Sequence, residues 1–208
     1  MARVLRTPAA TTVAVLLLTI GFAAGGPDFK STWKAPEAAG ISFAGKKVAG
    51  LVITSDDNLR VSAEEQLVRE LEPRRIQGVA TYRLAPKEVL RSVDQARPWF
   101  ERAGIEGVVA LRPVSDDTQK IYTPAVWTST SYSTLWGYYG YSYGVTFTPG
   151  SSRTDRTLVV ETLIYSMPLD KLLWAGVATT ENPKEAPKFM KQLVEAAVKE
   201  MKKQRLIS

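Results

Sequence analysis

The chain has 208 residues and a formal net charge of +6, from 27 Lys and Arg against 21 Asp and Glu, and it contains neither cysteine nor histidine. This length suits one domain with a sizeable core. The missing residue types exclude disulfides, thiol nucleophiles, Ser-His and Cys-His catalysis and the usual zinc, haem and iron–sulfur ligands, so no cofactor is expected.

The first 26 residues have the layout of an export signal. Arg3 and Arg6 precede an uncharged apolar run from Ala9 to Ala24, and small residues follow it. As a helix this run would span about 24 Å at about 1.5 Å per residue, less than the ~30 Å hydrocarbon core of a bilayer. The pattern predicts export to the periplasm or cell envelope with cleavage of residues 1–26. Retention of the signal as an uncleaved membrane anchor is the alternative.

Residues 27–44 mix proline, glycine, serine and charge around two isolated aromatics, Phe29 and Trp33. This mixture is typical of an extended tether that docks its aromatics on a neighbouring domain. The domain itself is expected to occupy residues 45–208.

Short apolar, β-branched runs predict three strands in the first half of the domain, at 46–54, 78–84 and 107–114. Helix signals lie between these runs. The resulting βαβαβ order implies a parallel or mixed sheet with helices packed on it.

The first of these helices is expected to begin at Ser62, which forms a capping box with Glu65. A second helical stretch begins at Pro86, and Pro98 is expected to break it into two pieces. Gly104 follows as the expected C-cap.

The second half of the domain has a different pattern, with extended runs in place of alternating strands and helices. Extended runs at 120–130, 143–147, 156–167 and 171–180 indicate antiparallel hairpins added to the sheet. A last amphipathic helix is capped by Asn182, and its apolar stripe is expected to be buried. That stripe consists of Met190, Leu193, Val194, Ala197, Val198 and Met201. The predicted class is therefore α/β (α+β), with a mixed sheet from a βαβαβ half, antiparallel hairpins and a C-terminal amphipathic helix.

An aromatic stretch rich in glycine and serine occupies residues 129–145. Its glycines disfavour a strand, so the stretch predicts a long loop, and the mixture of rings with flexible residues is typical of binding loops. The candidate binding residues are Tyr132, Trp136, Tyr138, Tyr139, Tyr141 and Tyr143. The alternative, given equal weight, is that these rings cover the protein's own sheet.

The tripeptide Ser-Asp-Asp occurs twice, each time after an apolar strand. Asp56 and Asp57 in the first copy and Asp116 and Asp117 in the second could meet at the carboxyl edge of the sheet. There they would form a Ca²⁺ or Mg²⁺ site, or the acid/base pair of a glycan hydrolase. Serine and aspartate are also ordinary turn and helix-start residues, which is the favoured interpretation.

Seven basic residues and three acids lie between Pro183 and Arg205. Lys199, Lys202, Lys203 and Arg205 could contact an anionic membrane surface peripherally. The favoured alternative is a solvated face that complements the helix dipole. The patch is too small to indicate nucleic-acid binding.

Several segments together resemble a family of small bacterial envelope lipoproteins of unknown function. They are "FKSTWKAP", "GIEGVVALRPV", the Gly/Tyr/Trp-rich stretch and "VETLIYSMPLDKLLWAG". The pattern is also similar to the fold of the curli secretion lipoprotein, the N-terminal domain of the Tol β-propeller protein and the outer-membrane activators of peptidoglycan synthases. Members of the family carry an acylated cysteine where this chain has Phe22, so lipid anchoring through cysteine is not expected here.

These features predict an exported, non-enzymatic envelope module that contacts an envelope protein or peptidoglycan through the aromatic stretch. The alternatives are the carboxylate-based glycan hydrolase, a divalent-cation-binding protein, and an architectural subunit of an envelope assembly.

Overall fold

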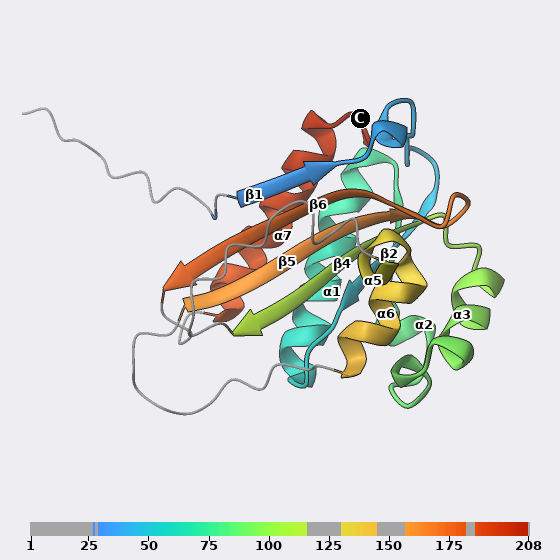
Figure 1. Cartoon of the computed structure of the whole chain (residues 1–208), viewed down its shortest axis with the longest axis horizontal. Helices are drawn as coiled ribbons and strands as arrows, with labels where there is room; N and C mark the ends of the chain where they lie inside the picture. The colour runs from blue at the N-terminus through green and yellow to red at the C-terminus, as the bar shows by residue number, and fades with distance from the viewer. Residues whose placement is uncertain (1–26, 28, 116–129, 145–156, 182–185, 208) are drawn as a thin grey trace, which may run out of the picture.

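A six-stranded mixed sheet with the order β1-β6-β5-β4-β2-β3 forms the centre of the protein (Figure 1). The computed structural model describes residues 27, 29–115, 130–144, 157–181 and 186–207. The strands are β1 (Phe29–Lys34), β2 (Lys47–Val52), β3 (Gln77–Ala80), β4 (Gly107–Ser115), β5 (Thr157–Ser166) and β6 (Lys171–Glu181). The helices are α1 (Asp57–Leu71), α2 (Thr81–Leu84), α3 (Val93–Arg102), α5 (Thr130–Ser133), α6 (Leu135–Gly144) and α7 (Ala186–Lys203), with 3-10 turns η1 (Pro36–Ala38), η2 (Glu72–Arg74) and η3 (Val89–Arg91).

The parallel part of the sheet consists of β3, β2 and β4, and it confirms the predicted mixed sheet. β2 lies in the middle, with Gly50 opposite Ala80 of β3 on one side and Val109 of β4 on the other. The chain moves outward from β2 to β3 through α1, then returns past β2 to β4 through α3. The direction of winding therefore reverses between β2 and β4.

The antiparallel part is built by β4, β5, β6 and β1. The hairpin of β5 and β6 confirms the extended runs predicted at 156–167 and 171–180. Residues 120–129 and 145–147 of the other two runs lie outside the described residues, and residues 143 and 144 end α6 instead of starting a strand.

The predicted tether is an edge strand. β1 pairs antiparallel with β6, and a register shift between Phe29 and Ser31 places Phe29 and Trp33 against opposite faces of the sheet. The docking of Phe29 is as predicted, because its ring meets Trp174 edge-on at 4.9 Å between centroids. Residues 29–34 of this segment form a strand because the edge of β6 supplies backbone partners that local composition does not reveal.

Three predicted boundaries are corrected. α1 begins at Asp57, and its N-cap is Asp56, so the capping box at Ser62 is wrong. β3 ends at Ala80 and a short helix takes the rest of the run predicted as strand. Pro98 lies inside α3, and the expected break falls at Ser92. Proline is tolerated there because it lies on the exposed side, where water can hydrogen-bond the carbonyl that it leaves unpaired.

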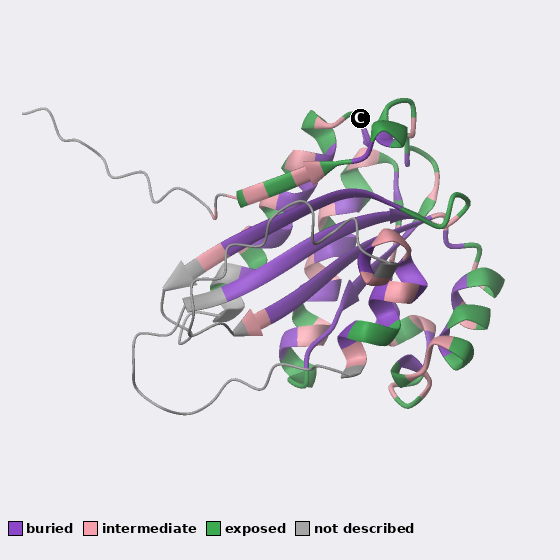
Figure 2. Ribbon diagram, in the orientation of Figure 1, coloured by how far each residue is buried: buried purple, intermediate pink, exposed green. Residues whose placement is uncertain are grey.

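Both faces of the sheet are covered. α1 and α7 lie behind it in Figure 1, while α3, α5 and α6 cover the other face, and the strands between them are buried (Figure 2). The apolar stripe predicted for α7 is confirmed, since each of its members is at most 1% exposed. No helix in the described ranges has the length and apolar character needed to cross a membrane.

Candidate functional site

A crevice of about 330 Å³ opens where β2 ends, at the point where the winding of the sheet reverses. Open α/β sheets bind ligands at such switch points, outside the carboxyl ends of their strands. Each wall comes from a different part of the chain. The lining residues are Thr54 and Ser55 after β2, Arg60 on α1, Lys87, Leu90 and Arg91 between α2 and α3, and Tyr143 on α6.

Positive charge dominates this crevice. Asp57, on the first turn of α1, forms ion pairs with two of the three basic side chains of the crevice. Its Oδ2 lies 2.6 Å from Lys87 Nζ and its Oδ1 lies 3.6 Å from Arg60 Nε. The hydrogen bond from Lys87 lowers the pKa of Asp57, and Arg60 and Arg91 add smaller effects in the same direction. The basic side chains therefore outnumber the acids that interact with them, which are Asp57 and, for Arg60, the buried Glu64 of α1.

The side chain of Arg60 is largely buried and has an unsatisfied hydrogen-bond donor. Its side chain is 12% exposed, and its buried Nε has no hydrogen-bond partner. The distance of 3.6 Å to Asp57 is too long for a hydrogen bond. A buried donor without an acceptor is costly, so this N–H is available to an acceptor brought by a ligand.

The acidic residue behind the crevice is Glu64 of α1, which is fully buried. It accepts hydrogen bonds from the backbone N–H of Val52 at 3.1 Å and of Tyr82 at 2.8 Å, and from the hydroxyl of Thr81. Burial raises the pKa of Glu64 although these donors oppose the shift. Burial also raises the pKa of Tyr143, to about 12, so its hydroxyl stays protonated and neutral. Glu64 therefore ties α1 to β2 and α2 and has no free oxygen to offer a ligand.

The predicted aromatic loop is a pair of helices, α5 and α6. Tyr132, Trp136, Tyr138 and Tyr139 are at most 7% exposed, and they pack against the sheet and α3. Burial of these rings stabilises a helix that its glycines alone would disfavour. At Gly140, a Cβ would lie 3.2 Å from the side chain of Val93, so glycine permits close packing on α3.

The prediction of a loop is therefore wrong, and the rings cover the protein's own sheet. Tyr141 is 45% exposed and Tyr143 lines the crevice, so these two candidate binding residues remain accessible.

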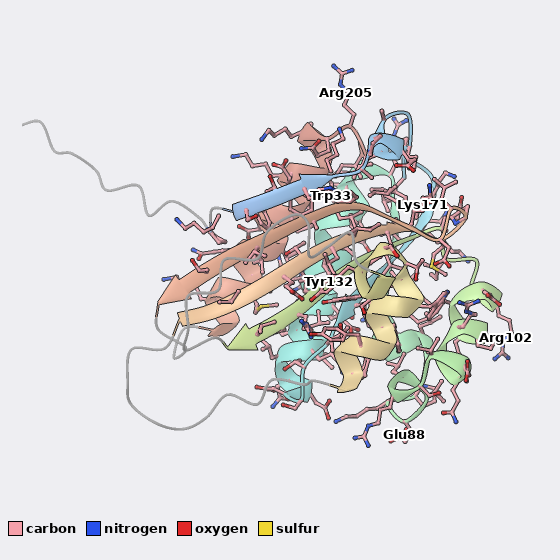
Figure 3. All side chains as sticks on the ribbon, viewed as in Figure 1. Trp33, Glu88, Arg102, Tyr132, Lys171 and Arg205 are labelled. Carbon is pink, nitrogen blue, oxygen red and sulfur yellow. The ribbon has the colours of Figure 1, made fainter. Side chains whose placement is uncertain are left out.

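Beneath the two helices lies a buried ion pair that sequence reasoning missed. Arg112 of β4 and Glu161 of β5 are opposite each other in the antiparallel register, with Arg112 Nη2 2.9 Å from Glu161 Oε2. Tyr132, labelled in Figure 3, donates its hydroxyl to Glu161 Oε1 at 3.0 Å, and Tyr138 reaches Oε2 at 3.4 Å. The guanidinium carbon of Arg112 also lies 5.3 Å from the centre of the Tyr141 ring. The sequence contains one indication of this pair. Each of two apolar strands carries a single charged residue, and the two charges are opposite.

The predicted aspartate site is not assembled within the described residues. Asp56 Oδ1 accepts from the backbone N–H of Asn58 and Leu59 as the cap of α1, and Asp57 is ion-paired. Asp116 and Asp117 lie outside the described residues. Across the described ranges, no group of three or more acidic side chains is arranged to hold a metal ion.

The basic residues predicted near the C-terminus are exposed on α7 and just beyond it. Lys203 approaches Glu200 at 3.5 Å, and Arg205 points away from the domain in Figure 3. Lys202 and Lys203 occupy the last turn of α7, where cations complement the helix dipole. Contact of Lys199 and its neighbours with an anionic surface stays a prediction.

No family model and no curated protein sequence matches this chain. Among solved structures it is similar to the PelC dodecamer from Paraburkholderia phytofirmans, with a TM-score of 0.42 and 11% identity over 84% of this chain and 94% of that chain. A leucine-to-methionine variant of that PelC matches with a TM-score of 0.41 and 12% identity, over 81% of this chain and 96% of the other. Similarity at this level assigns no function to the chain.

Proposed function

We propose that the protein is a non-enzymatic binding protein of the cell envelope, and that the crevice after β2 holds an anionic group of its ligand. The observation that carries the proposal is the set of three basic side chains around one carboxylate at the switch point of the sheet. The envelope location rests on the export pattern of residues 1–26. The ligand in this proposal is an anion-bearing component of the envelope, carried by a protein or by peptidoglycan.

The roles of the acids around the crevice favour binding over hydrolysis. A glycosidase needs two carboxyl groups about 5 to 9.5 Å apart, both free to act on the substrate. Here Asp56 is a helix cap, Asp57 is ion-paired with Lys87, and Glu64 is buried with its oxygens hydrogen-bonded. The basic side chains, in contrast, are not all paired with acids. Among the described residues, Arg91 makes no ion pair and is exposed.

Calorimetric titration of the purified protein with acetate, sulfate and phosphate at low ionic strength tests this proposal. We expect saturable binding of at least one anion, weakening as salt is added because the crevice is partly exposed. Arg91→Gln should weaken binding at least fivefold by removing one of the three cations. Lys199→Gln is the matched control, since it removes one positive charge from an exposed site on α7 and should leave binding unchanged.

The absence of heat with all three anions, or equal losses in the two variants, would contradict the proposal. Release of products from peptidoglycan fragments incubated with the protein, lost in Asp57→Asn, would establish the hydrolase instead.

A further inference from the structure

We infer that the crevice is built for the dianionic phosphate of a phosphomonoester, in preference to a carboxylate. This inference rests on the proposed function, because it names the chemical class of the anion that the same crevice holds.

The charge balance of the crevice is the first argument. Arg60, Lys87 and Arg91 outnumber the two acids that interact with them, Asp57 and the buried Glu64, so the crevice is net positive. A phosphomonoester carries up to two negative charges near neutral pH, since its second pKa is about 6. A carboxylate or a sulfate ester carries one negative charge, so the three cations of this partly enclosed site attract it less strongly.

The donors of the crevice are the second argument. The Arg60 Nε–H is buried and unpartnered, while Lys87 is already engaged by Asp57. Arginine presents its N–H groups in a planar fork that matches the oxygens of phosphate. The three terminal oxygens of a phosphomonoester can accept from Arg60, Arg91 and Lys87 together, whereas a carboxylate has two oxygens.

The size and lining of the crevice are the third argument. A volume of about 330 Å³ is at the lower end of the ~300 to 1,000 Å³ typical of small-molecule sites, and it exceeds what a bare phosphate needs. Leu90 and the ring of Tyr143 line the same space and provide apolar contact. The crevice can therefore hold the alcohol part of the ester, such as a sugar, beside the phosphate.

Two sources of a phosphomonoester are possible, a soluble sugar phosphate and a lipid headgroup. Glucose 1-phosphate represents the first, and vesicles of phosphatidylcholine with phosphatidic acid represent the second. Glucuronate, a sugar of similar size with a carboxylate, is the matched comparison ligand.

Titration calorimetry at pH 7.5 is the first test. We expect glucose 1-phosphate to bind at least tenfold more tightly than glucuronate, and Arg60→Lys to lose most of this preference, because it keeps the charge but removes the planar donor. Arg91→Lys is a second variant at an exposed position, and it should reduce the preference without affecting folding. Thermal unfolding of each variant establishes that it is folded.

The pH dependence is the second test. Between pH 7.5 and 5 the phosphate takes up a proton, so its affinity should fall severalfold while that of glucuronate does not. The groups that face the crevice do not explain such a fall. The charged and titratable groups there are Lys87, the two arginines, Asp57 and Tyr143. Burial raises the pKa of Tyr143 to about 12, so it stays neutral, and the hydrogen bond from Lys87 lowers the pKa of Asp57. Protonation of Glu64, whose pKa is raised by burial, would make the site more positive and act in the opposite direction.

Binding of phosphatidic acid vesicles that is lost in Arg60→Lys supports the inference and identifies a lipid source. Binding of glucose 1-phosphate alone supports it and identifies a soluble one. Equal affinity for glucose 1-phosphate and glucuronate overturns the phosphate inference and leaves anion binding intact. The absence of binding by any of these ligands overturns both.

Discussion

The helices that cover the two faces of the sheet are held there by different interactions. On one face α1 and α7 bury apolar side chains against Val48, Val109 and Ile164. On the other face, α5 and α6 cover an arginine–glutamate pair and bring tyrosine hydroxyls to it. The hydrophobic effect that stabilises the first face does not depend on the orientation of the groups. The stability of the second face depends on each hydrogen bond being formed.

This difference bears on the crevice. Tyr143 reaches the crevice from α6. The ring of Tyr138 packs beside Arg112 of β4 and holds α6 to the sheet, and the hydroxyl of Tyr139 donates to the Leu90 carbonyl of η3 at 2.7 Å. The polar face therefore positions one wall of the proposed site. The apolar face positions another, because α1 carries Arg60.

The largest effect is expected from breaking the ion pair of the polar face. Arg112→Ala leaves the Glu161 carboxylate buried without its cation, and we expect a loss of about 3 to 5 kcal/mol in the free energy of unfolding. Urea unfolding measures this loss. The double variant Arg112→Met with Glu161→Leu should lose less than the single one, since no buried charge is left alone. A loss under about 1 kcal/mol in Arg112→Ala would show that the two faces do not differ in this way.

A cavity in the apolar face should have a somewhat smaller effect. Leu193 on α7 is fully buried, and Leu193→Ala is expected to cost about 3 kcal/mol from lost burial and the cavity left behind. This loss should be the same at low and high salt, because no charge is removed. Lys199→Ala, on the exposed side of the same helix, is the control and should change stability by less than about 0.5 kcal/mol. A salt-dependent loss in Leu193→Ala would contradict the apolar description of this face.

The smallest effect concerns Glu64, the acid buried where the apolar face meets the crevice. Its pKa is raised by burial, so between the unfolded pKa near 4.3 and the higher folded pKa the native state holds a proton that the unfolded chain has lost. Stability should therefore fall as the pH rises through this window. Urea unfolding at several pH values should show wild type losing stability relative to Glu64→Gln by up to about 1.4 kcal/mol per pH unit. Parallel curves for the two proteins would mean that the pKa of Glu64 is not raised.

The elements that could be predicted from the sequence are those with a strong local period. The stripe of α7 and the hairpin of β5 and β6 were predicted correctly because helix and strand repeats of apolar residues are visible within ten residues. Capping was predicted at the wrong place. Ser62 and Glu65 match a capping box, but α1 starts six residues earlier, at the cap Asp56, soon after β2 has ended.

The aromatic stretch shows why local propensity fails. Its glycines argue against regular structure, yet Gly140 lets α6 approach Val93 closely, and the tyrosines find buried partners on β4 and β5. Those partners are distant in sequence, so the stabilisation they provide is not visible in residues 129–145 themselves.

By itself, the sequence determined the class of fold, the burial of α7 and the expectation of export, because each depends on composition or on a local period of apolar residues. Only the tertiary structure decided that Arg112 and Glu161 form a buried pair and that Arg60, Lys87 and Arg91 converge at one end of β2. The ion pair forms across the antiparallel strands β4 and β5, whereas the three cations come from α1 and from the segment between α2 and α3, which meet where the winding of the sheet reverses. Convergence of this kind follows from long-range packing, for which no short stretch of sequence carries a signal.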